Sequence, residues 1–86
     1  MEPVLLAILD ELRRAEGIHP DWPTDPVHAA AVIAEEAGEI VKAVNNIVDG
    51  KKKNKDSDYR TEAIHCAAMC VRFLKNLDSY DWNVKY

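Results

Sequence analysis

The sequence predicts an all-α protein: an antiparallel helical hairpin with an extra N-terminal helix, assembling into a four-helix-bundle-type oligomer. Composition is the first observation behind this prediction. Alanine is abundant and the 86 residues include only one Phe, two Trp and three Tyr, which favours closely packed helices over a β-sandwich. Apolar residues also recur with the helical period in three segments. The length predicts a single domain, 1–86, that buries only about 60% of its unfolded surface and is marginally stable alone.

The first helix is expected around 3–16. Pro3 suits a first helical position, and Gly17 ends the segment. An apolar stripe with i, i+3, i+4, i+7 spacing runs along it and consists of Leu5, Ile8, Leu9 and Leu12. Residues 17–25 form a loop with two prolines and Trp22, whose indole either caps a small core or stacks on a base near an active site.

The second helix is expected at about 26–49. Asp25 provides an N-cap acceptor, Pro26 follows at the first helical position, and Gly50 stops the helix. Its apolar face extends over nearly three heptads and comprises positions 30, 33, 34, 37, 40, 41, 44, 47 and 48.

The third helix is expected at about 58–78, after the lysine-rich segment 50–57. That segment is predicted to be a solvated loop, with phosphate attraction as the alternative. Ile64, Ala68 and Val71 lie on the face of this helix that points away from the hairpin. A two-helix hairpin cannot cover that face, so it predicts association with a second chain. The tail, 78–86, is expected to pack across a groove or a partner.

Charge and the absence of certain segments exclude some functions. The net charge is −4, whereas a surface that binds a nucleic-acid polymer usually has a basic excess. The chain has no signal peptide and no apolar run near 18 residues, which predicts a cytoplasmic protein with no membrane partner. Cys66 and Cys70 lie one turn apart on an expected helix, where an intrachain disulfide fits poorly, so they are predicted to be small buried thiols.

Glutamates on the second and third helices are the main functional clue. On a wheel of about 100° per residue, Glu36 lies inside the apolar arc, Glu39 at its edge, and Glu35 further toward water. Met69 and Phe73 flank Glu62 within roughly 20° on the third helix. A carboxylate in an apolar arc costs several kcal/mol unless it is paired, protonated or bound to a metal. These glutamates therefore require a partner.

An antiparallel hairpin brings those glutamates together. Equal distances from the connecting loop place Glu39 opposite Glu62, so Glu36, Glu39 and Glu62 are expected to converge, with His65 one turn further on. A hard divalent cation would relieve their mutual repulsion, since carboxylate oxygen is the ligand that Mg²⁺ and Mn²⁺ prefer. The alternative is a salt bridge from these glutamates to Arg72 or Lys42.

The same residues resemble a known family. Glu35-Glu36-x-x-Glu39, then 22 residues, then Glu62-x-x-His65, is similar to the E-E-x-x-E and E-x-x-D signature of the MazG-like all-alpha nucleoside triphosphate pyrophosphohydrolases. The run 62–74 is similar to the third helix of a small single-domain branch of that family. A tryptophan before the second helix, here Trp22, is a further point of similarity to that branch. The resemblance covers roughly 20–77.

The resemblance implies an enzyme that cleaves a nucleoside triphosphate between the α and β phosphates, releasing a monophosphate and pyrophosphate, often in house-cleaning of non-standard nucleotides. Glu36, Glu39 and Glu62 would hold Mg²⁺, or Mn²⁺ as the alternative, with His65 as a further ligand. Glu35 would act on the attacking water. The expected substrate contacts are Lys42, Asn46, Arg72 and Trp22.

One departure from the family pattern keeps alternatives open. The last aspartate of the signature is His65 here, and imidazole is a better ligand for Mn²⁺, Fe²⁺ or Zn²⁺ than for Mg²⁺. Either His65 does not contact the cation, or the metal preference has shifted, or activity has been lost. Glu-x-x-His is also the half-motif of di-iron carboxylate bundles, which a homodimer of this hairpin would complete. A redox metalloprotein is therefore the second hypothesis. A catalytically silent helical interaction module is the third.

Overall fold

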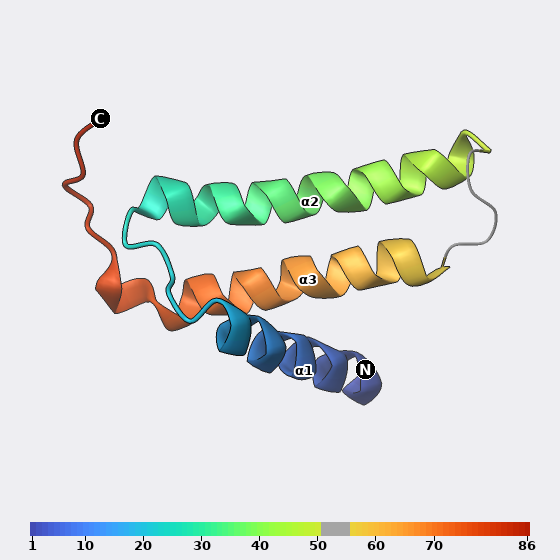
Figure 1. The fold of residues 1–86 in the computed structure, drawn as a ribbon, viewed down its shortest axis with the longest axis horizontal. Helices are drawn as coiled ribbons and strands as arrows, with labels where there is room; N and C mark the ends of the chain where they lie inside the picture. The colour runs from blue at the N-terminus through green and yellow to red at the C-terminus, as the bar shows by residue number, and fades with distance from the viewer. Residues whose placement is uncertain (51–55) are drawn as a thin grey trace.

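The computed structural model describes residues 1–50 and 56–86, and all of its regular structure in these ranges is helical. The helices are α1 (Glu2–Ile18), α2 (Pro26–Val48) and α3 (Asp56–Lys75), followed by a short 3-10 helix, η1 (Leu77–Ser79). Helices α2 and α3 lie side by side and antiparallel, and α1 packs against α3 on the other side (Figure 1). The predicted all-α hairpin with an N-terminal helix is confirmed. The lysine segment 51–55 lies outside the described residues.

Capping residues set the ends of α2 as expected. The Asp25 carboxylate accepts a hydrogen bond from the Val27 N–H at 2.9 Å and a longer one from His28, and so satisfies backbone donors that the first turn leaves free. Gly50 follows the helix with φ of 74°, a left-handed conformation that glycine adopts without steric cost.

Helix α3 ends three residues earlier than predicted, at Lys75 rather than 78. The Asn76 side chain explains this difference. Its Nδ2 donates to the Arg72 carbonyl at 2.8 Å, while its backbone N–H bonds to the Phe73 carbonyl. The α-helical bonding pattern is thereby replaced by a 3-10 turn.

The core lies where α1 meets α3, and it consists of Leu12, Ala15, Ala68 and Met69. Ala68 is fully buried, and Val71 packs against the same cluster. The expectation that a second chain covers this face of α3 is therefore wrong, because α1 already covers it. Apolar side chains are exposed elsewhere, on α2 and on α1, where they include Leu5 and Leu9 of the predicted stripe. No helix in the described part of the chain is long and apolar enough to cross a membrane.

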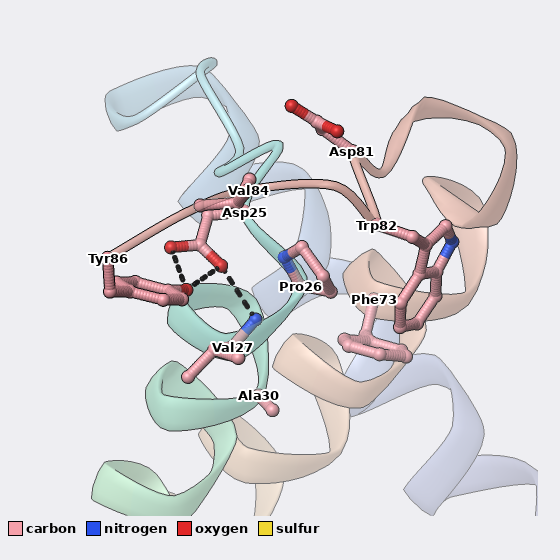
Figure 2. Close-up of a pocket in the computed structure, with 9 residues that line it drawn as sticks. All are labelled: Asp25, Pro26, Val27, Ala30, Phe73, Asp81, Trp82, Val84 and Tyr86. Carbon is pink, nitrogen blue, oxygen red and sulfur yellow. Dashed lines mark hydrogen bonds between the residues drawn. The ribbon is translucent and has the colours of Figure 1, made fainter.

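The C-terminal tail packs across the open end of the hairpin and leaves a cavity of about 390 Å³ beside it. Figure 2 shows Trp82 and Phe73 on one wall, and Tyr86 beside Asp25 on the other. The Tyr86 hydroxyl donates to the Asp25 carboxylate, which raises the pKa of Tyr86 to about 12. The predicted groove beneath the tail is present.

Candidate metal centre

Three side chains from α2 and α3 form a cluster with metal-ligand chemistry: Glu36, Glu62 and His65. One ligand atom from each lies within 4.8 Å of the others, and all three residues are half-buried. Glu62 and His65 share a face of α3 because they are three residues apart. Glu36 reaches them from α2, across the line where the two helices pack. We call these three residues the Glu-His cluster.

Helix α1 adds a fourth residue that the sequence analysis missed, Glu11. Its Oε2 lies 3.6 Å from His65 Nε2, and its side chain is only 12% exposed. Arg14 holds Glu11 from one turn further on, with guanidinium contacts of 2.7 and 2.8 Å. The sequence placed Glu11 off the apolar stripe of the first helix. No pattern in the sequence showed that this side of α1 would face His65.

Burial and neighbouring charges shift the pKa values of two carboxylates in this centre, Glu36 and Glu11. Burial raises the pKa of Glu36, which Glu62, Glu35 and Glu39 raise further, whereas His65 opposes the shift. The hydrogen bond from Arg14 lowers the pKa of Glu11, outweighing the opposite effect of its burial. Glu36 is therefore a carboxylate whose charge lacks sufficient compensation, and a bound cation would supply it.

Two open cavities lie on either side of the contact between Glu11 and His65. One, of about 310 Å³, is bounded by α1 and the first half of α3 and includes Asp10 and Thr61. The other, of about 240 Å³, includes Glu36 and Arg72 in its lining. Glu11, Arg14 and His65 line both cavities. Both cavities therefore reach His65 of the Glu-His cluster, and the second also reaches Glu36.

Glu39 does not join the cluster within this chain, in contrast to the expected convergence of three glutamates. The register of the hairpin is the reason. Cys66 Sγ lies 4.0 Å from the carbonyl oxygen of Ile33, and this pairing sets Glu36, not Glu39, opposite Glu62. Glu39 lies about one turn closer to the connecting loop and is exposed. Glu35 is exposed as well, as its wheel position predicted.

The residues predicted to contact substrate are spread over the molecule. Lys42 is exposed and Asn46 half-buried, both on α2 beyond Glu39. Arg72 is 4% exposed; its Nη2 donates to the carbonyls of His19 and Asp21, at 2.7 and 3.4 Å. Within the described residues, neither Arg72 nor Lys42 forms an ion pair with a glutamate of the centre. The alternative of a salt-bridged glutamate cluster is therefore wrong for these residues.

Trp22 belongs to the core rather than to an open base-stacking site. Its ring packs against the core cluster and beneath the Arg72 guanidinium, and its Nε1–H donates to the Tyr80 hydroxyl at 2.9 Å. Tyr80 in turn donates to the Phe73 carbonyl. Of the two roles predicted for Trp22, capping of a small core agrees with these contacts.

Comparisons with known protein families, with curated proteins and with solved structures find no match to this chain. Ligand atoms about 2.1 Å from a common ion lie at most about 4.2 Å apart, so small side-chain rotations would bring the Glu-His cluster around one ion. Two carboxylates and one imidazole suit Mn²⁺, Fe²⁺ or Zn²⁺, and Mg²⁺ when waters complete its shell. The residues fit a divalent cation.

Proposed function

We propose that this chain is a metal-dependent nucleoside triphosphate pyrophosphohydrolase, releasing a nucleoside monophosphate and pyrophosphate. The observation that carries the proposal is the Glu-His cluster, with its ligand atoms within 4.8 Å of one another. The similarity of Glu35-Glu36-x-x-Glu39 and Glu62-x-x-His65 to the MazG-like signature supports it, because two of the signature's carboxylates belong to this cluster.

In the proposed reaction Glu36, Glu62 and His65 hold the divalent cation. When bound, such a cation neutralises charge on phosphate oxygens, which is the main requirement of phosphoryl chemistry. Glu35 is exposed on α2 next to Glu36 and would accept a proton from the attacking water, or orient that water. Glu39 would contribute one turn away, either to a second cation or to the water shell of the first.

Mg²⁺ is the proposed cofactor, with Mn²⁺ as a substitute that the imidazole favours. The substrate phosphates would enter along the two cavities that Arg14 lines, where its positively charged guanidinium would attract the phosphate oxygens. Lys42 and Asn46, further along α2, would contact the remaining part of the nucleotide. House-cleaning of non-standard nucleotides is the proposed physiological use.

The proposed enzyme is a homo-oligomer of the four-helix-bundle type. Its support is an exposed apolar strip on α2, where valines at i, i+3 and i+7 spacing, 43–77% exposed, share one side of the helix: Val41, Val44 and Val48. Pairing two hairpins along this strip would bury it and bring four long helices together. Val27, 62% exposed near the start of α2, adds to the exposed apolar surface.

Pyrophosphate release from a panel of canonical and modified nucleoside triphosphates, with Mg²⁺ and with Mn²⁺, tests the proposal. The native chain should release pyrophosphate only with metal, and Glu36→Gln and Glu62→Gln should each lose at least about 100-fold in rate, since they remove charge that holds the cation. Glu16→Gln, which changes a carboxylate on α1 paired with Lys75, is the matched control. No metal-dependent release from any substrate would refute the proposal.

A second candidate, a di-iron-type carboxylate and histidine metalloprotein, is favoured by one specific observation. Glu62 and His65 have the Glu-x-x-His spacing and also lie in one cluster with Glu36, the composition of half a di-iron site. Loading with Fe²⁺ followed by exposure to oxygen should then give visible absorption and two iron ions per dimer. An iron-loaded protein without that absorption excludes this candidate.

A further inference from the structure

The two ring nitrogens of His65 face carboxylates from different helices. Nδ1 lies 3.9 Å from Glu62 Oε2, on its own helix, and Nε2 lies 3.6 Å from Glu11 Oε2, on α1. A neutral imidazole has one N–H donor and one lone pair. Only the nitrogen with the lone pair can bind a metal, so the position of the single proton decides which ring nitrogen can be the metal ligand.

The cation would sit on the Nδ1 side of the ring, because Glu62 lies on that side and is the cluster partner that His65 faces across one helical turn. Coordination there requires the proton to be on Nε2. Glu11 is the carboxylate that faces Nε2, and a small rotation of either side chain would shorten their 3.6 Å contact to a hydrogen bond. Without Glu11, the Glu62 carboxylate would compete for the proton at Nδ1.

Glu11 is itself held in place. Arg14 contacts both carboxylate oxygens, with Nε at 2.7 Å from one and Nη2 at 2.8 Å from the other. Leu12, the neighbour of Glu11 in the chain, is buried in the core between α1 and α3. The Glu11 side chain therefore faces His65 from a fixed backbone position, and it is 12% exposed while Arg14 is 56% exposed.

We propose that Glu11 is a positioning residue that holds the proton of His65 on Nε2 and so leaves Nδ1 free to bind a divalent cation. The proposal rests on the metal-binding role given above to the Glu-His cluster. Carboxylates that orient a metal-binding histidine typically contribute 10- to 100-fold to metal affinity, an order-of-magnitude range. Through Glu11, helix α1 would become part of the metal centre without touching the ion.

The first test needs no metal. Nitrogen-15 NMR of the histidine rings in the metal-free protein, at about pH 9, above the usual range of histidine titration, reads the tautomer directly. His65 should carry its proton on Nε2 in the native chain and shift toward the Nδ1–H form in Glu11→Ala. A native ring protonated on Nδ1, or a tautomer that Glu11→Ala leaves unchanged, overturns the proposal. This result does not depend on whether the protein hydrolyses nucleotides.

The second test is a double-mutant cycle on Mn²⁺ affinity, measured by electron paramagnetic resonance of free Mn²⁺. Glu11→Ala should weaken binding about 10- to 100-fold in the native background and by less than about twofold when His65→Ala is already present. Glu16→Ala, another α1 carboxylate with a basic partner, should leave affinity unchanged. An equal loss in both backgrounds would make Glu11 a direct ligand and overturn the positioning role.

A further variant keeps the test informative if Glu11→Ala does not fold. Arg14→Ala retains the carboxylate but frees it to rotate, and it should give a smaller loss of Mn²⁺ affinity in the same direction. Unchanged Mn²⁺ affinity in a folded Glu11→Ala protein would overturn this inference and leave the proposed hydrolase intact. A native protein that shows the Nε2–H tautomer and binds Mn²⁺ but releases no pyrophosphate from any nucleotide would instead count against the hydrolase alone.

Discussion

The guanidinium of Arg72 lies over the indole ring of Trp22, 4.9 Å from the ring centroid. The same guanidinium donates to the carbonyls of His19 and Asp21, so it ties α3 to the loop that follows α1. Since α1 ends at Ile18, the positive charge also meets the negative end of that helix. A cation that is 4% exposed thus finds compensation in an aromatic face, two carbonyls and a helix dipole.

Replacing Arg72 should therefore affect folding more than substrate binding. Arg72→Gln removes the buried charge and its carbonyl contacts, and we expect a loss of about 2–4 kcal/mol in the free energy of unfolding. Denaturant titration measures it, with Lys75→Gln as the control, since Lys75 is in an ion pair at the surface. If Arg72→Gln is as stable as the native chain but raises KM, Arg72 is a substrate contact instead.

The Tyr80 hydroxyl is the next link of the same cluster. It accepts from Trp22 and donates to the Phe73 carbonyl, each at 2.9 Å, while its side chain is buried. Tyr80→Phe leaves the Trp22 N–H unpaired and removes one of the two hydrogen bonds that the Phe73 carbonyl accepts, so unfolding should cost about 1–2 kcal/mol less. Tyr86→Phe is the matched control, because Tyr86 is 87% exposed, and it should change stability less. Equal effects would contradict the assigned role of Tyr80.

Glu36 should make the metal-free protein less stable as pH rises. Burial raises the pKa of Glu36 in the folded protein above the ordinary value of 4.5. At a pH between the unfolded-state pKa and this higher folded-state pKa, the folded protein keeps a proton that the unfolded chain has already lost. The contribution of this bound proton to the free energy of unfolding is fully present below the pKa of Glu36 in the unfolded chain. It is lost as pH rises through the pKa of Glu36 in the folded protein. Glu36→Gln should thus have the higher melting temperature at neutral pH, and the difference should vanish near pH 4, a rough limit.

Thermal melting between about pH 4 and pH 8 without metal measures that difference. Added Mn²⁺ should then raise the melting temperature of the native protein but not that of Glu36→Gln, because ligand binding stabilises only the state that binds it. Glu35→Gln, at the exposed neighbouring position, should respond to Mn²⁺ as the native chain does. A native protein whose melting temperature exceeds that of Glu36→Gln at neutral pH without metal would contradict the destabilisation assigned to the burial of the Glu36 charge.

His65 should set the metal preference. His65→Asp replaces imidazole by carboxylate within the Glu-His cluster, and carboxylate oxygen suits Mg²⁺ better than nitrogen does. The ratio of Mg²⁺- to Mn²⁺-supported turnover should rise several-fold in this variant. The measurement is steady-state pyrophosphate release with each metal at saturation. A ratio that stays level or falls would remove His65 from the ligands of the cation.

The valine strip of α2 predicts how the oligomer responds to charge. Val44→Glu places a carboxylate in the proposed interface, where an unpaired buried charge costs several kcal/mol, so the assembly should dissociate. Asn45→Glu changes the adjacent exposed position, about 100° around the helix, and should leave the mass unchanged. Light scattering at micromolar concentration measures both. A native chain that is already monomeric would refute the proposed association.

Local sequence signals predicted the helices well because each signal acts over a few residues. The Asp25 and Pro26 pair begins α2 at the expected position, and Gly50 follows its end with positive φ. The stripe on the first helix identified the face that buries Leu12 and packs Ile8 against the core, whereas Leu5 and Leu9 of the same stripe are exposed. Glu36 and Glu62 were both expected to turn toward apolar surroundings, and both are half-buried. These results depend only on helical period and on the chemistry of capping residues.

What only the tertiary structure decided concerns how the helices meet. The register of α2 on α3, seen in the contact of the Cys66 thiol with the Ile33 carbonyl, pairs Glu36, not Glu39, with Glu62. The approach of α1 to α3 covers Ala68 and brings Glu11 to His65. A helix's own sequence specifies its apolar face, but sliding and docking are set by side-chain packing between segments far apart in the chain.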